Sequence, residues 1–438
     1  MKKEICICWF RRDLRLNDHA AFYYALTSGY PVLPIFIFDP KILNKLSDKE
    51  DKRLVFIHEE LLKLNSELNK CGSAFIIKHD TVISVFKNLL KSYNVKAVYL
   101  NHDYEPEAIV RDEELRQYLY NSGIELYTFK DQVIFEKSDI MKSNGSPYTV
   151  FTPYAKRWKE KYSTLATIEY PSQNHLSGCL NIENQTIPSL EDIGFNKVLF
   201  DYPKFNISEE LIRNYSETRN IPSEQGTSLI SVYLRFGVIS IRHLVNLAIR
   251  WNETWLNELI WREFFMMILY HFPHVVENSF KKKYDQIQWR NNEFEFQAWC
   301  RGETGYPMVD AGMRQLNESG LMHNRVRMIT AGFLCKHLLI DWRWGEAYFA
   351  KKLLDYELSS NNGNWQWAAG TGCDAAPYFR IFNPNSQLLK FDPKKIYIRY
   401  WIKDFDSNYL SLNPIVDHEF ARKRALELYR NTLTESYK

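Results

Sequence analysis

Hydrophobic residues in the first 130 positions form short runs that are separated by longer amphipathic stretches. The runs fall at residues 5–10, 32–38, 74–77, 97–100 and 124–129, and each has the length of a buried β-strand. Between them, helical spacing of apolar residues occurs in stretches such as 52–69 and 81–93. Buried strands that alternate with helices are typical of a doubly wound parallel sheet. The pattern therefore predicts an α/β domain over residues 1–130.

The rest of the chain has a different pattern. Residues 131–205 are rich in Ser, Asn, Pro and Tyr and have weak periodicity, which predicts a long interdomain connection. From residue 206 to residue 438, helical spacing dominates and convincing strand patterns are absent. A chain of 438 residues is also too long for one ordinary core. We therefore expect a second, all-α domain over residues 206–438.

Composition narrows the class of protein. The aromatic share is 15%, with 12 Trp, and the net charge of +3 permits a nucleic-acid partner without demanding one. The seven cysteines are scattered and fit no zinc spacing, so we expect reduced thiols and no metal. The sequence has no signal-peptide pattern and no apolar run of membrane-spanning length. These features predict a cytoplasmic protein with no membrane partner.

The segment 355–384, DYELSSNNGNWQWAAGTGCDAAPYFRIFNP, has no core-helix pattern. Asparagines at 361, 362 and 364 lie beside Trp365 and Trp367, and nearby glycines allow close approach to the backbone. Aromatic faces, amide groups and bare backbone together suit a planar ligand with polar edges. The alternative is a glycine-rich loop with two buried indoles.

A carboxylate lies between two tryptophans in WLNELIWR, residues 255–262. Helical geometry places Trp255, Glu258 and Trp261 on one face, so the carboxylate is available to a ligand. The alternative is an exposed ion pair of Glu258 with Arg262, four residues later on the same helix.

Two more clusters carry polar groups suited to ligands. In EQGTSLIS, residues 224–231, small hydroxyl residues after a glycine could hold an anion at a helix start, or could simply cap that helix. In MHNRVRM, residues 322–328, Asn324, Arg327 and Met328 share one helical face. The sequence contains no catalytic triad and no P-loop. No GxGxxG follows the first predicted strand, so the standard dinucleotide fingerprint is also absent.

Together these segments resemble the photolyase/cryptochrome family, and within it the class I photolyases that repair cyclobutane pyrimidine dimers. The resemblance extends over WFRRDLRLNDH, EQGTSLISVYLRFGVIS, WLNELIWREF, TGYPMVDAGMRQL, MHNRVRM and NNGNWQWAAGTGCDAAPYFRIFNP. It implies an α/β N-terminal domain and an all-α C-terminal domain that holds FAD. It also implies a monomeric enzyme that acts on UV-damaged DNA, by light-driven electron transfer from reduced FAD to a flipped-out dimer.

The resemblance implies two groups of cofactor contacts. The FAD phosphates and ribitol would be held by Tyr215, Thr227, Ser228, Leu229 and Ser231. The rest of the cofactor would be surrounded by Trp255, Arg262, Asn324, Arg327, Asp355, Glu357 and Asn361.

The resemblance also implies a pocket for the lesion. Its polar and shape contacts and its aromatic walls would be Glu258, Asn324, Met328, Trp261 and Trp367. DNA would be contacted by Glu258 at the pyrimidine edge and, at phosphates, by Arg219, Arg325 and Arg380. Stacking on aromatic walls is worth about 1–3 kcal/mol per base, which offsets the cost of extruding a badly stacked dimer.

Two further features follow from the resemblance. Trp365, Trp342 and Trp289 match an electron-transfer chain that reduces the flavin. The second, light-harvesting chromophore is undetermined among deazaflavin, flavin and folate. Its neighbourhood would include Phe36, Arg53, Asp103 and Glu105.

Two other functions fit the same family. A cryptochrome-type blue-light receptor would have this fold with little or no repair. Plant-type receptors tend to have Asp where this chain has Asn324, and they usually add a long C-terminal tail. A photolyase for (6-4) photoproducts would rely on pocket histidines, and Asn324 with Met328 argues against it.

Overall fold

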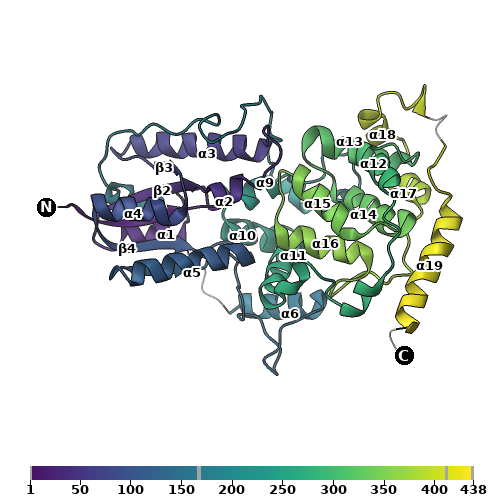
Figure 1. The fold of residues 1–438 in the computed structure, drawn as a ribbon, viewed down its shortest axis with the longest axis horizontal. Coiled ribbons are helices and arrows are strands. Elements are labelled where there is room, and N and C mark those ends of the chain that lie inside the picture. The colour runs from purple at the N-terminus through teal and green to yellow at the C-terminus, as the bar shows by residue number, and fades with distance from the viewer. Residues whose placement is uncertain (1, 165–168, 410–412, 436–438) are drawn as a thin grey trace. The chain divides into compact units, whose positions relative to one another are not determined.

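The computed structural model describes residues 2–164, 169–409 and 413–435 (Figure 1). The chain divides into two compact units. The first comprises residues 1–136, 160–205 and 229–250, and the second comprises residues 137–159, 206–228 and 251–438. The predicted domain boundaries at residues 130 and 205 remain predictions.

The first unit is built on a parallel five-stranded sheet, as the sequence pattern predicted. The strands are β1 (Glu4–Phe10), β2 (Val32–Phe38), β3 (Ile76–His79), β4 (Asn94–Asn101) and β5 (Glu125–Phe129). Their order is β3-β2-β1-β4-β5, and Trp9 of β1 is in register with Ile35 of β2. The order reverses at β1, which is the arrangement of a doubly wound sheet.

Helices pack on both faces of this sheet because successive strand residues point to opposite sides. On one face, Ile7 and Trp9 belong to a core with Phe86 of α4 and Leu115 of α5. On the other face, Phe10 contacts Phe22 of α1 edge to face, at 5.1 Å between ring centroids. The helices that lie wholly or mainly in this unit are α1 (Ala20–Leu26), α2 (Pro40–Leu43), α3 (Lys52–Asn69), α4 (Val82–Ser92), α5 (Pro106–Tyr120), α9 (Ser231–Arg235) and α10 (Ile241–Trp251), with a 3-10 turn at Ser172–Gly178.

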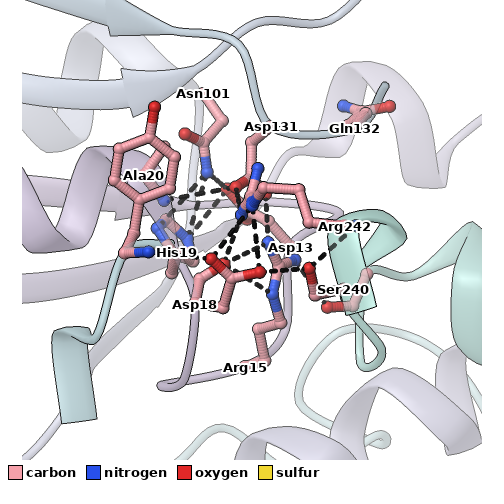
Figure 2. Close-up of polar contacts among 12 residues, drawn as sticks. Asp13, Arg15, Asp18, His19, Ala20, Asn101, Asp131, Gln132, Ser240 and Arg242 are labelled. Atoms are coloured by element: carbon pink, nitrogen blue, oxygen red, sulfur yellow. Dashed lines mark hydrogen bonds and ion pairs between the residues drawn. The ribbon is translucent and has the colours of Figure 1, made fainter. Parts of the chain in front are cut away.

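A buried ionic network includes Arg15 and Asp18, which follow β1 in the chain (Figure 2). Asp131 is fully buried and accepts hydrogen bonds from Arg15 at 2.6 Å and from Arg242 at 2.8 Å. Arg242 also pairs with Asp18 at 2.9 Å. Burial alone would raise the pKa of Asp131, but the two guanidinium groups hold that pKa well below its usual range. The network therefore ties the N-terminal motif WFRRDLRLNDH to residues 131 and 242 within this unit.

The second unit is helical, as predicted. Its helices are α6 (Phe151–Tyr162), α7 (Glu209–Arg213), α8 (Tyr215–Thr218), α11 (Glu253–His271), α12 (Glu293–Arg301), α13 (Pro307–Ser319), α14 (Asn324–Gly332), α15 (Trp342–Lys352), α16 (Leu358–Ala369), α17 (Pro384–Phe391), α18 (Ile396–Trp401) and α19 (His418–Glu435), with a π-helix at Phe333–Leu338 and 3-10 turns at Pro273–Val276 and Lys282–Gln286. In the described part of this unit, extended pairing is limited to one bridge between Met141 and Pro147.

The interpretation of residues 131–205 as a connection with weak periodicity was wrong at α6. Tyr154, Ala155 and Trp158 are buried at helical spacing. Trp158 Nε1 donates to Glu263 Oε1 of α11 at 2.5 Å, which fixes α6 to α11. The surrounding Ser, Asn and Pro residues concealed this short stripe in the sequence.

The described residues contain neither a membrane-spanning helix nor a cluster of metal ligands. No helix among them is long and apolar enough to cross a membrane. Within the same residues, no group of three or more His, Cys, Asp or Glu side chains could hold a metal ion. The seven cysteines are all free thiols.

Candidate functional site

A cavity of about 100 Å³ in the second unit collects many of the predicted site residues. It lies between α14, the end of α15 and α16, together with the segment 353–357 that precedes α16. The predicted site residues that line it are Asn324, Arg327, Met328, Asp355, Glu357, Asn361, Trp365 and Trp367. These residues are up to 43 positions apart in the sequence (367 minus 324), so the fold assembles a single site from two of the sequence clusters.

Local helix signals place the elements of this site. Asn252 caps α11 by accepting from the backbone N–H groups of Thr254 and Trp255. The His323 imidazole caps α14 through the N–H of Arg325. The helix α16 ends at Gly370, whose φ of 86° is left-handed and favours glycine. Residues 358–369 therefore form a regular helix, and the alternative of a glycine-rich loop is wrong for them.

Two arginines in this region are held by carboxylates. Arg327 Nη2 lies 2.9 Å from Asp355 Oδ2, and Arg327 Nε donates to the Met322 carbonyl at 2.7 Å. Arg262 Nε lies 3.3 Å from Glu357 Oε2. These pairs fix the direction of each guanidinium, because a carboxylate and a guanidinium share a planar geometry. The wall of the cavity therefore presents one oriented guanidinium, that of Arg327, beside the carboxylates of Asp355 and Glu357, which suits a planar ligand with polar edges.

Behind Asn361 lies a carboxyl group that the sequence analysis missed. Asn361 Nδ2 donates to Glu346 Oε1 of α15 at 2.8 Å. Burial raises the pKa of Glu346, and the bond from Asn361 opposes that shift. A signal existed in the sequence, since Glu346 follows Trp342 by four residues and precedes Phe349 by three, on the buried face of α15.

Glu258 and Arg262 of α11 each pair with a residue of another segment and not with each other. Glu258 accepts from Arg219 Nη1 at 2.6 Å, whereas Arg262 pairs with Glu357. The alternative of an ion pair between Glu258 and Arg262 is therefore wrong. Burial raises the pKa of Glu258, and Arg219 opposes this effect.

Trp261 is half-buried and has an aromatic partner that the sequence analysis missed. The Phe151 ring, at the start of α6, stacks on Trp261 with centroids 3.7 Å apart and planes 5° apart. The Phe265 ring lies 5.4 Å away at 30°. Trp255, by contrast, is only 2% exposed. Phe151 is distant in sequence and lies in the segment that was interpreted as a connection.

Two of the three arginines expected at DNA phosphates, Arg325 and Arg380, have different surroundings. Arg325 donates to the Asn220 side-chain oxygen at 2.8 Å, and its guanidinium lies 4.5 Å from the centre of the Phe391 ring. Arg380 is exposed. Both belong to the second unit, and within the described residues the Arg325 side chain donates only to the neutral amide of Asn220.

The three tryptophans of the implied electron-transfer chain belong to one packed region. Trp342 and Trp365 are buried in the same core, and Trp289 packs against it. Gly345 makes room for this packing, since a Cβ there would lie 2.2 Å from the Trp365 ring. Trp289 meets the Tyr429 ring edge to face at 6.2 Å.

Three of the residues implied at the FAD phosphates, Thr227, Ser228 and Leu229, lie on the loop before α9, whereas Tyr215 begins α8 and Ser231 begins α9. Ser228 is buried, Thr227 is half-buried, and Leu229 has a left-handed φ of 52°. Ile230 occupies the N-cap of α9, and no side chain makes a capping bond there. The helix-cap alternative for this cluster is therefore wrong. Ser231 is exposed and Tyr215 half-buried.

The residues implied at the second chromophore lie in the first unit. Phe36 is buried against Phe38, and Arg53 pairs with Asp51 at 2.5 Å. Asp103 and Glu105 share Arg12, at 3.4 and 2.7 Å.

Comparison with known proteins assigns the chain to a family. Residues 6–172 match the family model for DNA photolyase, and residues 255–409 match the FAD binding domain of DNA photolyase. The deoxyribodipyrimidine photo-lyase of Alkalihalophilus pseudofirmus is 36% identical, with 96% of this chain and 97% of the relative covered. The corresponding protein of Vibrio cholerae is 35% identical, with 97% and 99% covered.

Solved structures agree with this assignment. A class III photolyase from Agrobacterium tumefaciens aligns with a TM-score of 0.86 at 32% identity, over 99% of this chain and 98% of that one. A photolyase from Sulfolobus tokodaii, described with two FAD molecules, aligns at 0.82 and 33% identity, over 98% and 100%. A Synechocystis cryptochrome aligns at 0.85 and 26%, over 98% and 99%. The cavity and both α11 ion pairs include residues of the FAD-binding segment, and the chain belongs to the DNA photolyase family.

Proposed function

We propose that this photolyase repairs cyclobutane pyrimidine dimers in DNA as a class I enzyme, and that it works as a monomer. The observation that carries the proposal is the cavity in which Asn324, Met328 and Trp367 line the same space as the Arg327–Asp355 ion pair and Asn361. One site thus presents both the groups expected at a flavin and the groups expected at a lesion.

The residues around the cavity fit FAD by their chemistry. The ion pair of Arg327 with Asp355 supplies an oriented cation beside a carboxylate, and Asn361 supplies an amide held by Glu346. An amide next to a flavin ring offers a hydrogen bond without a titrating proton. Reduced FAD, when bound, supplies light absorption and the electron for dimer splitting.

The protein side chains bind and orient the substrate in this proposal. Trp261 and Trp367 stack on the extruded bases, Asn324 and Met328 shape the pocket, and Glu258 accepts a hydrogen bond from the pyrimidine edge. Extrusion of an intact base costs a few kcal/mol, and least for a damaged base. Stacking worth about 1–3 kcal/mol per base is enough to offset that cost.

Repair is favoured over the two alternatives by specific observations. The fold alone does not separate a photolyase from a cryptochrome, since both align with TM-scores of 0.85 or above. The photo-lyase relatives are more similar in sequence, at 30–36% identity against 26% for the cryptochrome. Among the described residues that line the cavity, none is a histidine, which disfavours (6-4) repair.

A second chromophore is proposed in the first unit, near Phe36, Arg53, Asp103 and Glu105. The Sulfolobus photolyase with two FAD molecules makes a flavin one candidate, beside deazaflavin and folate. Extraction of the purified protein and mass spectrometry of the released chromophores identifies it.

One assay tests the function. Purified protein with reduced flavin is mixed with oligonucleotides that carry one thymine dimer or one (6-4) photoproduct, in light and in darkness. The proposal predicts loss of the cyclobutane dimer in light only, with the (6-4) substrate unchanged. No light-dependent loss would favour a receptor, and loss of the (6-4) product would favour the other repair class.

The tryptophan chain has its own test. Trp342→Phe removes the middle indole of the proposed chain while keeping an aromatic ring in the core. We expect photoreduction of oxidised flavin to slow strongly and flavin content to stay constant, as measured by absorbance during blue illumination. Photoreduction at the wild-type rate would contradict the assigned chain.

A further inference from the structure

The ion pair of Arg219 with Glu258 joins two residues to which the proposed function gives different ligands. Arg219 follows α8, Glu258 lies within α11, and Arg219 Nη1 donates to Glu258 Oε1 at 2.6 Å. The guanidinium lies 5.3 Å from the centre of the Tyr215 ring. The Arg219 and Glu258 side chains are 22% and 33% exposed. The pair is therefore well formed and still accessible to a ligand from solvent.

This pair lies among other cationic groups. The pKa of Arg325 is lowered by burial and by the charge of Arg219. Burial, followed by the charges of Arg325, Arg327 and Arg219, lowers the pKa of His323 to about 4. The positive charge of Arg327 is compensated by the carboxylate of Asp355, whereas the side chain of Arg325 donates to the neutral amide of Asn220.

Arg325 and Arg219 therefore differ in how readily each can bind a DNA phosphate. Arg325 has no carboxylate partner among the described residues, so its charge remains available to DNA. Arg219 is bound by Glu258, and a guanidinium that already donates to a carboxylate has less to offer a phosphate. Any DNA that engages Arg219 must compete with Glu258.

We propose that Glu258 restrains Arg219 until a lesion enters the pocket, and thereby limits the affinity of the enzyme for undamaged DNA. This inference rests on the proposed function. An extruded pyrimidine presents its ring N–H to the Glu258 carboxylate and takes the place of Arg219 as its partner. The released guanidinium then binds a phosphate beside the lesion. In undamaged duplex the bases stay paired and stacked, so nothing replaces Arg219.

Removal of the carboxylate should make undamaged DNA bind more tightly. In Glu258→Gln, Arg219 is free to bind a phosphate without a lesion. One added phosphate contact makes the slope of log affinity against log salt steeper by about 0.9. At 0.1 M salt this corresponds to an affinity increase on the order of five- to tenfold. Affinity for dimer-containing duplex should not rise in parallel, because the base contact is lost, so discrimination falls.

The reciprocal variant identifies Arg219 as the cause. Arg219→Gln should leave binding to undamaged duplex unchanged, because this arginine is already restrained there. On dimer-containing duplex its salt slope should be shallower by about 0.9. The double variant should lack the increase seen in Glu258→Gln. An increase that persists in the double variant would overturn the proposal, as would an equal loss of slope on both duplexes in Arg219→Gln.

A matched control separates this effect from net charge. Glu303 pairs with Arg301 at 2.7 Å, and both side chains are about half exposed, at 50% and 52%. Glu303→Gln therefore makes the same charge change and frees another arginine of the same unit. Its binding to undamaged duplex should stay near that of the wild type. An increase equal to that of Glu258→Gln, or no change of slope in Glu258→Gln, would overturn the proposal.

The measurement is a salt titration of fluorescence anisotropy with both duplexes, on flavin-loaded protein of full length. If Glu258→Gln fails to fold, Arg219→Gln alone still tests the proposal through its difference between the two duplexes. Light-dependent repair by the wild type is recorded in parallel. Absence of repair refutes the proposed function, whereas repair with an unchanged slope in Glu258→Gln refutes this inference alone.

Discussion

Asp131 in the first unit and Glu258 in the second both pair with arginine, but their surroundings differ. Asp131 is fully buried and accepts from Arg15, Arg242 and the backbone of Ala20. Glu258 is a third exposed and accepts from Arg219. The pKa of Asp131 is lowered and that of Glu258 is raised. A fully buried carboxylate with three hydrogen-bond donors holds a fold together, whereas a partly exposed carboxylate that pairs with one arginine among the described residues can exchange that arginine for a ligand.

The largest expected effect comes from breaking the enclosed network. Asp131→Asn removes a charge that two buried guanidinium groups require, and such losses cost about 3–5 kcal/mol. Urea unfolding followed by circular dichroism should show this decrease in the free energy of unfolding. The exposed pair of Asp406 with Arg399 is the control, and Asp406→Asn should cost less than about 1 kcal/mol. Equal losses would mean that burial does not distinguish the two pairs.

The same variant should change the response to acid. The folded-state pKa of Asp131 lies below the unfolded value of about 3.9. Its stabilisation is therefore complete above that value and is lost as the pH falls through the lower folded-state pKa. The difference in stability between wild type and Asp131→Asn should shrink below about pH 4.

A smaller effect is expected at the aromatic wall of the second unit. Trp261→Ala should weaken binding to dimer-containing DNA by about 1–3 kcal/mol, because a stacking surface is lost. Undamaged duplex should bind almost as before. Trp158 is the matched control, since it is buried and bonded to Glu263. Trp158→Phe should lower stability and leave the ratio of the two affinities unchanged. Equal losses of affinity on both duplexes in Trp261→Ala would assign that ring to the core.

The smallest effect is expected at Arg325, which has no carboxylate partner in the part of the chain that the structure describes. Arg325→Ala should weaken damaged and undamaged duplex alike, since phosphate contacts carry no sequence information. The salt slope should become shallower by about 0.9. Arg301→Ala removes an arginine that Glu303 already compensates and should leave the slope near the wild-type value. A slope in Arg325→Ala equal to that of the wild type would remove Arg325 from the DNA contacts.

Much of the fold could be predicted from the sequence because its signals are local. Four strands overlap their predicted apolar runs closely, and α3 has the predicted bounds Lys52–Asn69. The strand β3 begins two residues later than its run at 74–77 and ends in Lys78 and His79. The helical face of α14 also placed Asn324 and Arg327 together, and both line the cavity. Periodicity within one element was sufficient for these predictions. Asn361 was expected only from the family resemblance, because the segment that forms α16 has no core-helix pattern.

Contacts between distant segments could not be predicted in this way. The stacking of Phe151 on Trp261 joins residues 110 positions apart (261 minus 151), and the bond from Arg219 to Glu258 spans 39 positions. Neither leaves a periodic signal. The bond from Asn361 to Glu346 leaves a weak local signal in the sequence, because Glu346 is a single acidic residue on an apolar helical face. The site residues were thus predictable one by one, whereas their partners required the structure.

The most direct test of the account is the repair yield of Glu258→Gln in a single turnover. Wild type and variant, each with reduced flavin, are mixed in excess with an oligonucleotide that carries one dimer, so that all of the DNA is bound. Repair per absorbed photon is then measured after a light flash. We predict a lower yield in the variant, with flavin content and the free energy of unfolding equal to those of the wild type. A full repair yield, or a variant whose loss of yield follows a loss of stability, would contradict the assignment of Glu258 to the ligand.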